Sequence, residues 1–150
     1  MLKSVALLSL LSVAVAAQLN WIPFNGRLYL QNTDKLNWLA AHDHCLENGA
    51  ELASVHNAEE QSFIASLVEA ANDWAWIGGI RLSPQAPFVW TDGTPFDYTN
   101  WKAAKYPLAN PAYNCLSFND NGPDNHGVPL NYTWTNYNCS KLASSICQKL

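Results

Sequence analysis

The run His42-Asp43-His44-Cys45 brings together the side chains of this 150-residue chain that are best suited to catalysis or metal binding. Imidazoles, a carboxylate and a thiol are the groups that ligate zinc or form a nucleophile and its base. The run lies in a helical pattern, where residues two apart point to different faces, so His42 and His44 do not converge. His56 and His126 have no acid or nucleophile at a recognisable spacing, and the chain has no His-Glu-x-x-His motif or phosphate-binding loop. The sequence therefore predicts that the protein is not an enzyme and needs no cofactor.

A second run is rich in the side-chain oxygens that calcium prefers. It extends from Asn119 to Asn125, includes Asp120 and Asp124, and has Gly122 at a place where the chain could turn sharply. Calcium takes six to eight oxygen ligands, several of them charged, and the run lacks the spaced acidic residues and final glutamate of a helix–loop–helix calcium site. Asn, Asp, Gly and Pro also form ordinary long turns. We interpret the run as a turn, with Asn119, Asp120 and Asp124 as weak metal candidates.

The beginning of the chain predicts export. Lys3 is followed by apolar or small residues from position 5 to 17, which is typical of a signal peptide over residues 1–17. This run is too short for the roughly 30 Å hydrocarbon core of a bilayer, so no membrane insertion is expected. Residues 18–150 are enough for one domain with a single core. We expect a secreted, extracellular protein.

The cysteines and the charge balance limit the functional classes further. Four cysteines in a short exported chain predict a disulfide framework, and their spacing alone allows three pairings. They are Cys45, Cys115, Cys139 and Cys147. Without Lys3 the chain has seven basic and twelve acidic residues and no basic cluster, so nucleic acid is not an expected partner.

Apolar periodicity predicts two helices and several short strands. The first helix runs from a cap at Thr33 or Asp34 to about Glu47, and the second follows an Asn57 cap to about Ala70. Three residues share the buried face of the first helix: Trp38, Ala41 and Cys45. Strands are expected near residues 26–31, 52–55, 75–80, 88–91, 132–137 and 144–148. Between Thr94 and Leu130 periodicity fades, which predicts a long surface segment of the kind that carries binding residues.

The tryptophans and cysteines together resemble the C-type lectin-like domain from Trp21 to Leu150. The motifs, in order, are Trp38-x2-Ala41-x3-Cys45, Trp76-Ile77-Gly78-Gly79, Trp90-Thr91-Asp92-Gly93, Asn100-Trp101 and Trp134-x4-Cys139-x7-Cys147. The resemblance implies an α+β fold of two helices packed on small antiparallel sheets, with a long irregular loop region that carries the ligand site. It also implies the disulfides Cys45–Cys147 and Cys115–Cys139.

The calcium site that the resemblance implies is not complete in this sequence. The family's Glu-Pro-Asn or Gln-Pro-Asp triplet follows the Asn-Trp pair by four to six residues, where this chain has Lys105-Tyr106-Pro107, with the proline one position out of register. The family's Trp-Asn-Asp reads Trp134-Thr135-Asn136, and the glutamate before the second cysteine is replaced within Ala112-Tyr113-Asn114. Too few charged oxygens remain for a hard cation. Calcium is therefore not expected at the usual family site.

The sequence thus predicts a recognition protein that binds a glycan or glycoprotein through its long loop without the usual calcium bridge. We expect ligand contacts from Tyr106, Tyr113, Asn114 and Asn136, since aromatic and amide side chains suit such contacts. One alternative is a protein-, ice- or mineral-surface-binding module that uses the fold as a scaffold, and another is a calcium-dependent lectin. The motif Asn131-Tyr132-Thr133 predicts N-glycosylation at Asn131.

Overall fold

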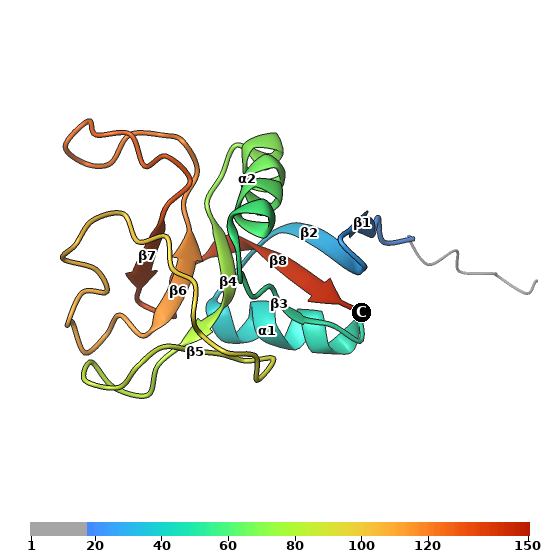
Figure 1. Ribbon diagram of the computed structural model, residues 1–150, viewed down its shortest axis with the longest axis horizontal. Helices are drawn as coiled ribbons and strands as arrows, with labels where there is room; N and C mark the ends of the chain where they lie inside the picture. Colours follow the sequence, from blue (N-terminus) through green and yellow to red (C-terminus); the bar gives the residue numbers. More distant parts are fainter. Residues whose placement is uncertain (1–17) are drawn as a thin grey trace, which may run out of the picture.

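The computed structural model describes residues 18–150, and the predicted signal peptide lies outside them. These residues form two helices and eight strands. In chain order they are β1 (Ile22–Phe24), β2 (Arg27–Leu36), α1 (Trp38–Glu47), β3 (Glu51–Leu52), α2 (Ala58–Ala71), β4 (Ala75–Ile80), β5 (Val89–Trp90), β6 (Cys115–Phe118), β7 (Trp134–Tyr137) and β8 (Ala143–Lys149). Figure 1 shows the helices and the first strands on one side, and long loops around β6 and β7 on the other.

The strands are hydrogen-bonded into a single sheet rather than the separate small antiparallel sheets that we expected. Their order is β1-β2-β8-β4-β6-β7, with β3 paired to β8 and β5 paired to β4. All pairs are antiparallel except β4 with β8. The last strand therefore lies between the first and second halves of the chain and joins them (Figure 1). The α+β class itself is confirmed.

Both predicted helices exist, but the first begins later than predicted. Asn37 caps α1 by accepting from the backbone N–H of Ala40, and β2 continues to Leu36. Thr33 and Asp34 therefore lie within β2, in an irregular part of the strand between Asn32 and Leu36, which both pair with β8. The cap of α2 is Asn57, as predicted.

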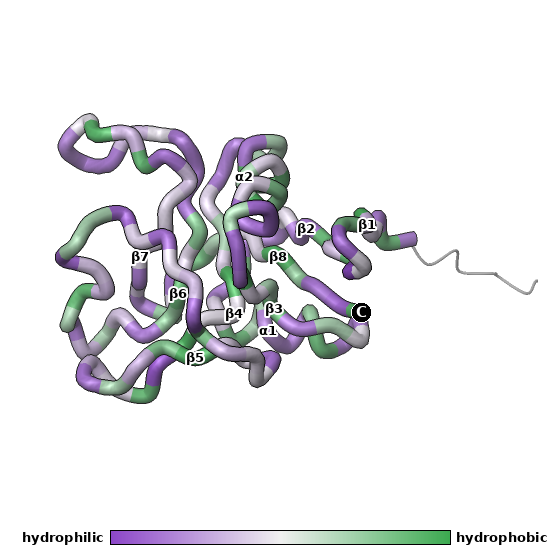
Figure 2. The backbone as a smooth tube through the Cα atoms, viewed as in Figure 1, coloured by the Kyte–Doolittle hydropathy of each residue, from purple (hydrophilic) through white to green (hydrophobic). Residues whose placement is uncertain are grey.

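The core lies on both faces of the sheet. Trp76 and Trp134 are the largest fully buried side chains, and each belongs to a different apolar cluster. A Cβ atom on Gly79 would lie 2.4 Å from a methyl carbon of Leu116, so only glycine allows β4 and β6 to approach this closely. Figure 2 shows hydrophobic residues along β8 in the middle of the molecule, whereas the loop above β7 is mostly hydrophilic.

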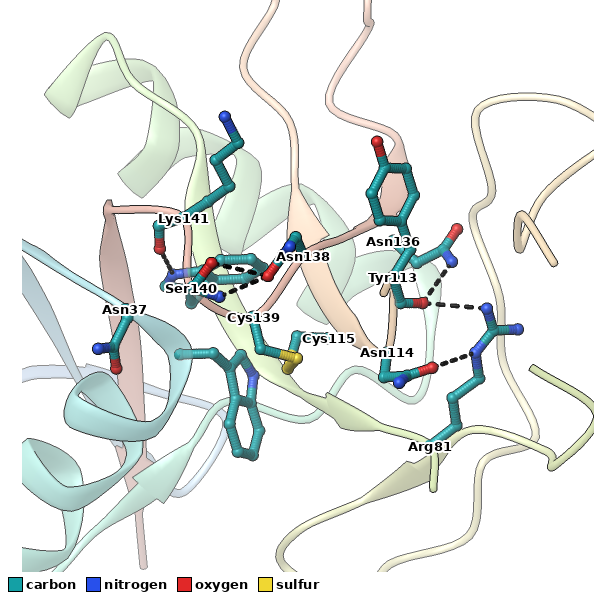
Figure 3. Close-up of a disulfide and its surroundings, with 12 residues drawn as sticks. Asn37, Arg81, Tyr113, Asn114, Cys115, Asn136, Asn138, Cys139, Ser140 and Lys141 are labelled. Atoms are coloured by element: carbon teal, nitrogen blue, oxygen red, sulfur yellow. Dashed lines mark hydrogen bonds between the residues drawn. A yellow bond between two sulfur atoms is a disulfide. The ribbon is translucent and has the colours of Figure 1, made fainter. Parts of the chain in front are cut away.

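The two disulfides have the predicted pairing. Cys45–Cys147 joins α1 to β8, and its Cα atoms are 5.4 Å apart. Cys115–Cys139 joins the start of β6 to the segment after β7, with a Cα separation of 5.2 Å. The second bridge therefore fixes the base of the long loop (Figure 3).

The long segment after Thr94 is less irregular than predicted, because it contains β6. All four β6 residues are buried, and they pair with both β4 and β7. Outside β6, the segment consists of turns and single bridges. Within residues 18–150, neither helix is long and apolar enough to cross a membrane.

Candidate ligand-binding surface

Arg81, one residue after β4, organises the long loop. Its side chain is 3% exposed, and its guanidinium donates to the backbone oxygens of Leu108, Tyr113 (3.0 Å) and Pro84 (3.2 Å). Its Nε also donates to Oδ1 of Asn114 at 3.2 Å. Burial lowers the pKa of the guanidinium, which nevertheless remains charged in proteins. One buried cation thus joins the segment after β4 to two parts of the long loop.

Asn136 of β7 holds two of the same backbone groups. Its Nδ2 donates to the backbone oxygens of Leu108 (2.9 Å) and Tyr113 (2.7 Å), and its Oδ1 accepts from the N–H of Leu108 at 2.7 Å. Figure 3 shows Asn136 and Arg81 approaching the Tyr113 carbonyl from different directions. We call Arg81 and Asn136 the loop clamp. Hydrogen bonds from two fixed side chains therefore hold the loop backbone in place.

The structure gives Asn136 a supporting role. The side chain is 1% exposed, and its amide group forms hydrogen bonds with the loop backbone. Ligand contact by Asn136 stays a prediction. Asn114 is also engaged, because it accepts from Arg81 and donates to the Pro111 carbonyl at 2.9 Å. Tyr106 and Tyr113 remain half-exposed.

The proline of the triplet slot, Pro107, is flanked by Tyr106 and Leu108. Neither side chain carries the carboxylate or amide oxygen that a calcium ion needs. The backbone of Leu108 instead forms hydrogen bonds with the Asn136 side chain.

The oxygen-rich run from Asn119 to Asn125 forms a tight turn. Asp124 pairs with Lys102 and accepts from the N–H groups of His126 (2.8 Å) and Val128 (2.9 Å). The Lys102 hydrogen bond, followed by those backbone bonds, holds the pKa of Asp124 well below its usual range. Asp120 accepts from the N–H of Gly122, as an Asx turn does. Within residues 18–150, no three His, Cys, Asp or Glu side chains converge as metal ligands.

Three aromatic side chains lie side by side next to the loop clamp, and we call Trp74, Tyr137 and Tyr113 the aromatic row. The ring centroids of Trp74 and Tyr137 are 5.6 Å apart, and those of Tyr137 and Tyr113 are 6.0 Å apart. Tyr137 is 38% exposed although it lies in β7. Burial raises the pKa of the Tyr137 hydroxyl, and the nearby hydroxyls of Tyr106 and Tyr113 add to this effect.

The sequence analysis missed two members of this row. Trp74 lies before β4 and Tyr137 ends β7, and the two are neighbours only because β6 pairs with both strands. Alternation gives no signal for them, because buried residues stand at both odd and even spacings from Trp74 and Tyr137. Of the two tyrosines that the sequence did single out, Tyr113 belongs to the row.

His56 has closer partners than its sequence spacing indicated. Its Nε2 lies 3.0 Å from both Ser54 Oγ and Thr94 Oγ1, and Asp92 accepts from both hydroxyls. The Ser54 hydroxyl is 1% exposed and also accepts from Gln148 at 2.7 Å, so it is not open to a substrate. Burial raises the pKa of Asp92, but hydrogen bonds from Ser54 and Thr94 outweigh this and lower it overall. The cluster joins β3, β5 and β8 rather than forming a nucleophile.

The fold of two helices and a disulfide-bonded sheet is matched in known proteins. A family model described as the lectin C-type domain matches residues 34–149. The chain belongs to the C-type lectin domain family. It is 35% identical over 130 residues to a type-2 ice-structuring protein of Osmerus mordax, covering 87% of this chain and 69% of that protein. It is 30% identical over 132 residues to nattectin, a galactose-specific lectin of Thalassophryne nattereri, covering 86% and 77%.

A solved structure supports the same assignment. The Ca²⁺-free form of a Ca²⁺-dependent type II antifreeze protein is similar to this C-type lectin-like chain with a TM-score of 0.75 and 33% sequence identity. The match covers 87% of this chain and 97% of the other. The relatives thus include a galactose-specific lectin as well as ice-structuring and antifreeze proteins.

The predicted glycosylation site lies outside the aromatic row. Asn131 is exposed, in a turn where Asn131 and Tyr132 both have positive φ angles. Exposure is what modification requires. Glycosylation at Asn131 stays a prediction.

Proposed function

We propose that this C-type lectin-like chain is a secreted recognition protein that binds a glycan, free or on a glycoprotein, without a calcium bridge. The observation that carries the proposal is the aromatic row beside the loop clamp. A sugar ring has an apolar C–H face that packs on an aromatic face, while its hydroxyls exchange hydrogen bonds with phenol groups. The row offers both kinds of contact from Tyr113 and Tyr137.

The loop clamp supports calcium-independent binding. In a calcium-bridged lectin the ion both orders the loop and contacts the sugar hydroxyls. Here Arg81 and Asn136 order the loop by direct hydrogen bonds, so a binding surface that is already ordered loses less entropy when the ligand binds. Ligand contact then depends on the aromatic side chains.

A second candidate is ice binding, and one surface observation favours it. Six small apolar residues are exposed between positions 103 and 112: Ala103, Ala104, Pro107, Ala109, Pro111 and Ala112. Such residues leave few charges on the loop, where Lys105 is exposed. The name of the ice-structuring relative points the same way. This segment suits a regular solid surface such as ice better than the aromatic row does.

The experiment is a glycan array probed with the mature chain in chelator, followed by affinity measurements on the best glycan with single variants. Tyr113→Ala and Tyr137→Ala are each expected to weaken binding by about 1 kcal/mol or more, as for central aromatic contacts in interfaces. Trp21→Ala is the matched control, because Trp21 is a half-buried aromatic near β1, on the other side of the molecule (Figure 1). Its affinity is expected to equal that of the parent.

Two results would contradict the proposal. One is an array without any bound glycan together with inhibition of ice recrystallisation by the same preparation, which would favour the second candidate. The other is an unchanged affinity in both row variants, which would move the binding site elsewhere on the domain.

A further inference from the structure

A cavity opens beside the aromatic row and is not accounted for by the loop clamp. Its volume is about 230 Å³, and it is lined by Trp74, Asn119, Leu130, Tyr137 and Lys141. Sites for drug-sized ligands usually measure about 300–1,000 Å³. This cavity therefore has room for one small ring rather than for an extended molecule.

Strand register explains why these residues meet. Trp76 is paired with Ser117, and Ser117 with Thr135, so these three residues lie on one face of the sheet. Trp74, Asn119 and Tyr137 each lie two residues from one of them and belong to the same face, because side chains alternate along a strand. The opposite face carries Phe118 and Trp134 in the main core.

Asn119 places a hydrogen-bond donor in the wall of the cavity. The residue is 2% exposed, and its Oδ1 accepts from the Thr135 hydroxyl at 3.0 Å, which fixes the orientation of the amide. Its Nδ2 has no hydrogen-bond partner among residues 18–150 and has almost no solvent-accessible surface. Buried amide donors almost always have a partner. The Nδ2 group is thus suited to an acceptor that enters the cavity.

Lys141 adds a positive charge at the rim. Its backbone is fixed because its carbonyl accepts from Trp76 Nε1 at 3.3 Å, and its ammonium forms no ion pair with any carboxylate of residues 18–150. Figure 3 shows the Lys141 side chain pointing to the same side as the Tyr113 ring. The acidic residues on neighbouring segments are already engaged: Asp73 with Lys35, Asp124 with Lys102, and Asp120 with the Gly122 N–H.

From these contacts we propose that the cavity binds one sugar residue that carries an anionic group, a carboxylate or a sulfate. The ring packs against Trp74 and Tyr137, the Asn119 amide donates to a ring substituent, and the anion faces Lys141. Both polar groups donate, so the ligand supplies acceptors only. This inference rests on the proposed glycan binding and names the class of sugar.

The test is an NMR titration of the ¹⁵N-labelled mature chain with three probes: D-glucuronate, glucose 6-sulfate and D-glucose. We expect shifts of the Trp74 indole N–H and the Asn119 side-chain amide, and at least one anionic probe binding about three to ten times more tightly than glucose. Comparing the two anions identifies which group is preferred. Lys141→Gln should bring all three affinities within about twofold, since only the charge contact is lost. Lys105→Gln, which removes an exposed lysine near Tyr106, should keep the preference.

An equal or higher affinity for glucose, shifts confined to other residues, or a preference that survives in Lys141→Gln would each overturn the inference. Asn119→Asp replaces the donor with an acceptor and should lower the affinity for both anions. If that variant does not fold, the Lys141 comparison decides alone. When the array glycan still binds through Tyr113 and none of the probes shifts the cavity residues, the cavity assignment is wrong and the proposed function stands.

Discussion

Arg81→Met tests whether the buried guanidinium stabilises the long loop. Truncation leaves the oxygens of Leu108 and Tyr113 bonded to Asn136, but the Pro84 oxygen and Asn114 Oδ1 lose the donors described above. Each acceptor left without a partner costs about 1–3 kcal/mol. Loss of the guanidinium from the Phe88 ring, 5.2 Å away, adds about 0.5–1 kcal/mol. Because methionine also relieves the burial of a charge, we expect a net loss of about 2–4 kcal/mol in the free energy of unfolding.

The assay is urea unfolding of the oxidised protein, followed by near-ultraviolet circular dichroism. Arg27→Met is the matched control, because Arg27 is half-buried and its guanidinium has no side-chain hydrogen bond to residues 18–150 that would be lost. Its unfolding free energy should stay within about 0.5 kcal/mol of the parent.

A double-variant cycle sharpens the test. Arg81 and Asn136 donate to the same two oxygens, so each single variant leaves one donor and the double variant leaves none. The combined loss of stability should exceed the sum of the single losses by about 1 kcal/mol. An additive cycle, or a loss below about 1 kcal/mol in Arg81→Met, would refute the loop clamp.

Two further predictions concern calcium and pH. Millimolar calcium should raise the melting temperature by less than about 2 °C in differential scanning calorimetry, because the usual ligands are missing and stabilisation follows RT ln(1 + [L]/Kd). A rise of many degrees would instead point to Asp120 and Asp124 as ligands. The pKa of Asp92 is lowered from 3.8 in the folded state, so its contribution is complete above that value and is lost as pH falls below it. Urea midpoints measured from pH 6 to pH 2 should therefore fall more steeply for the parent than for Asp92→Asn, and parallel curves would contradict this.

The sequence predicted the elements whose signals are local. Asn57 and the apolar spacing that follows define α2 within a few residues, and the four cysteines paired as the family resemblance implies. The predicted start of α1 was wrong because β2 continues to Leu36, which pairs with Ala143 of β8, more than 100 residues away. Such long-range pairing leaves no local pattern.

The candidate site was predictable only in part for the same reason. Tyr106 and Tyr113 are recognisable as aromatics among turn-forming residues. Arg81 has no motif around it, and its role depends on loop carbonyls that the tertiary fold brings to it. Asn136 was assigned to ligand contact because its position in the motif is visible in the sequence, whereas its burial is not.

The most direct test of calcium-independent recognition is the dissociation constant of the array-selected glycan, measured by calorimetry for the parent in millimolar calcium and again in excess chelator. The account predicts two constants that agree within about twofold, because the loop clamp and the aromatic row contain no metal ligand. Loss of binding in chelator, restored when calcium is added back, would contradict it.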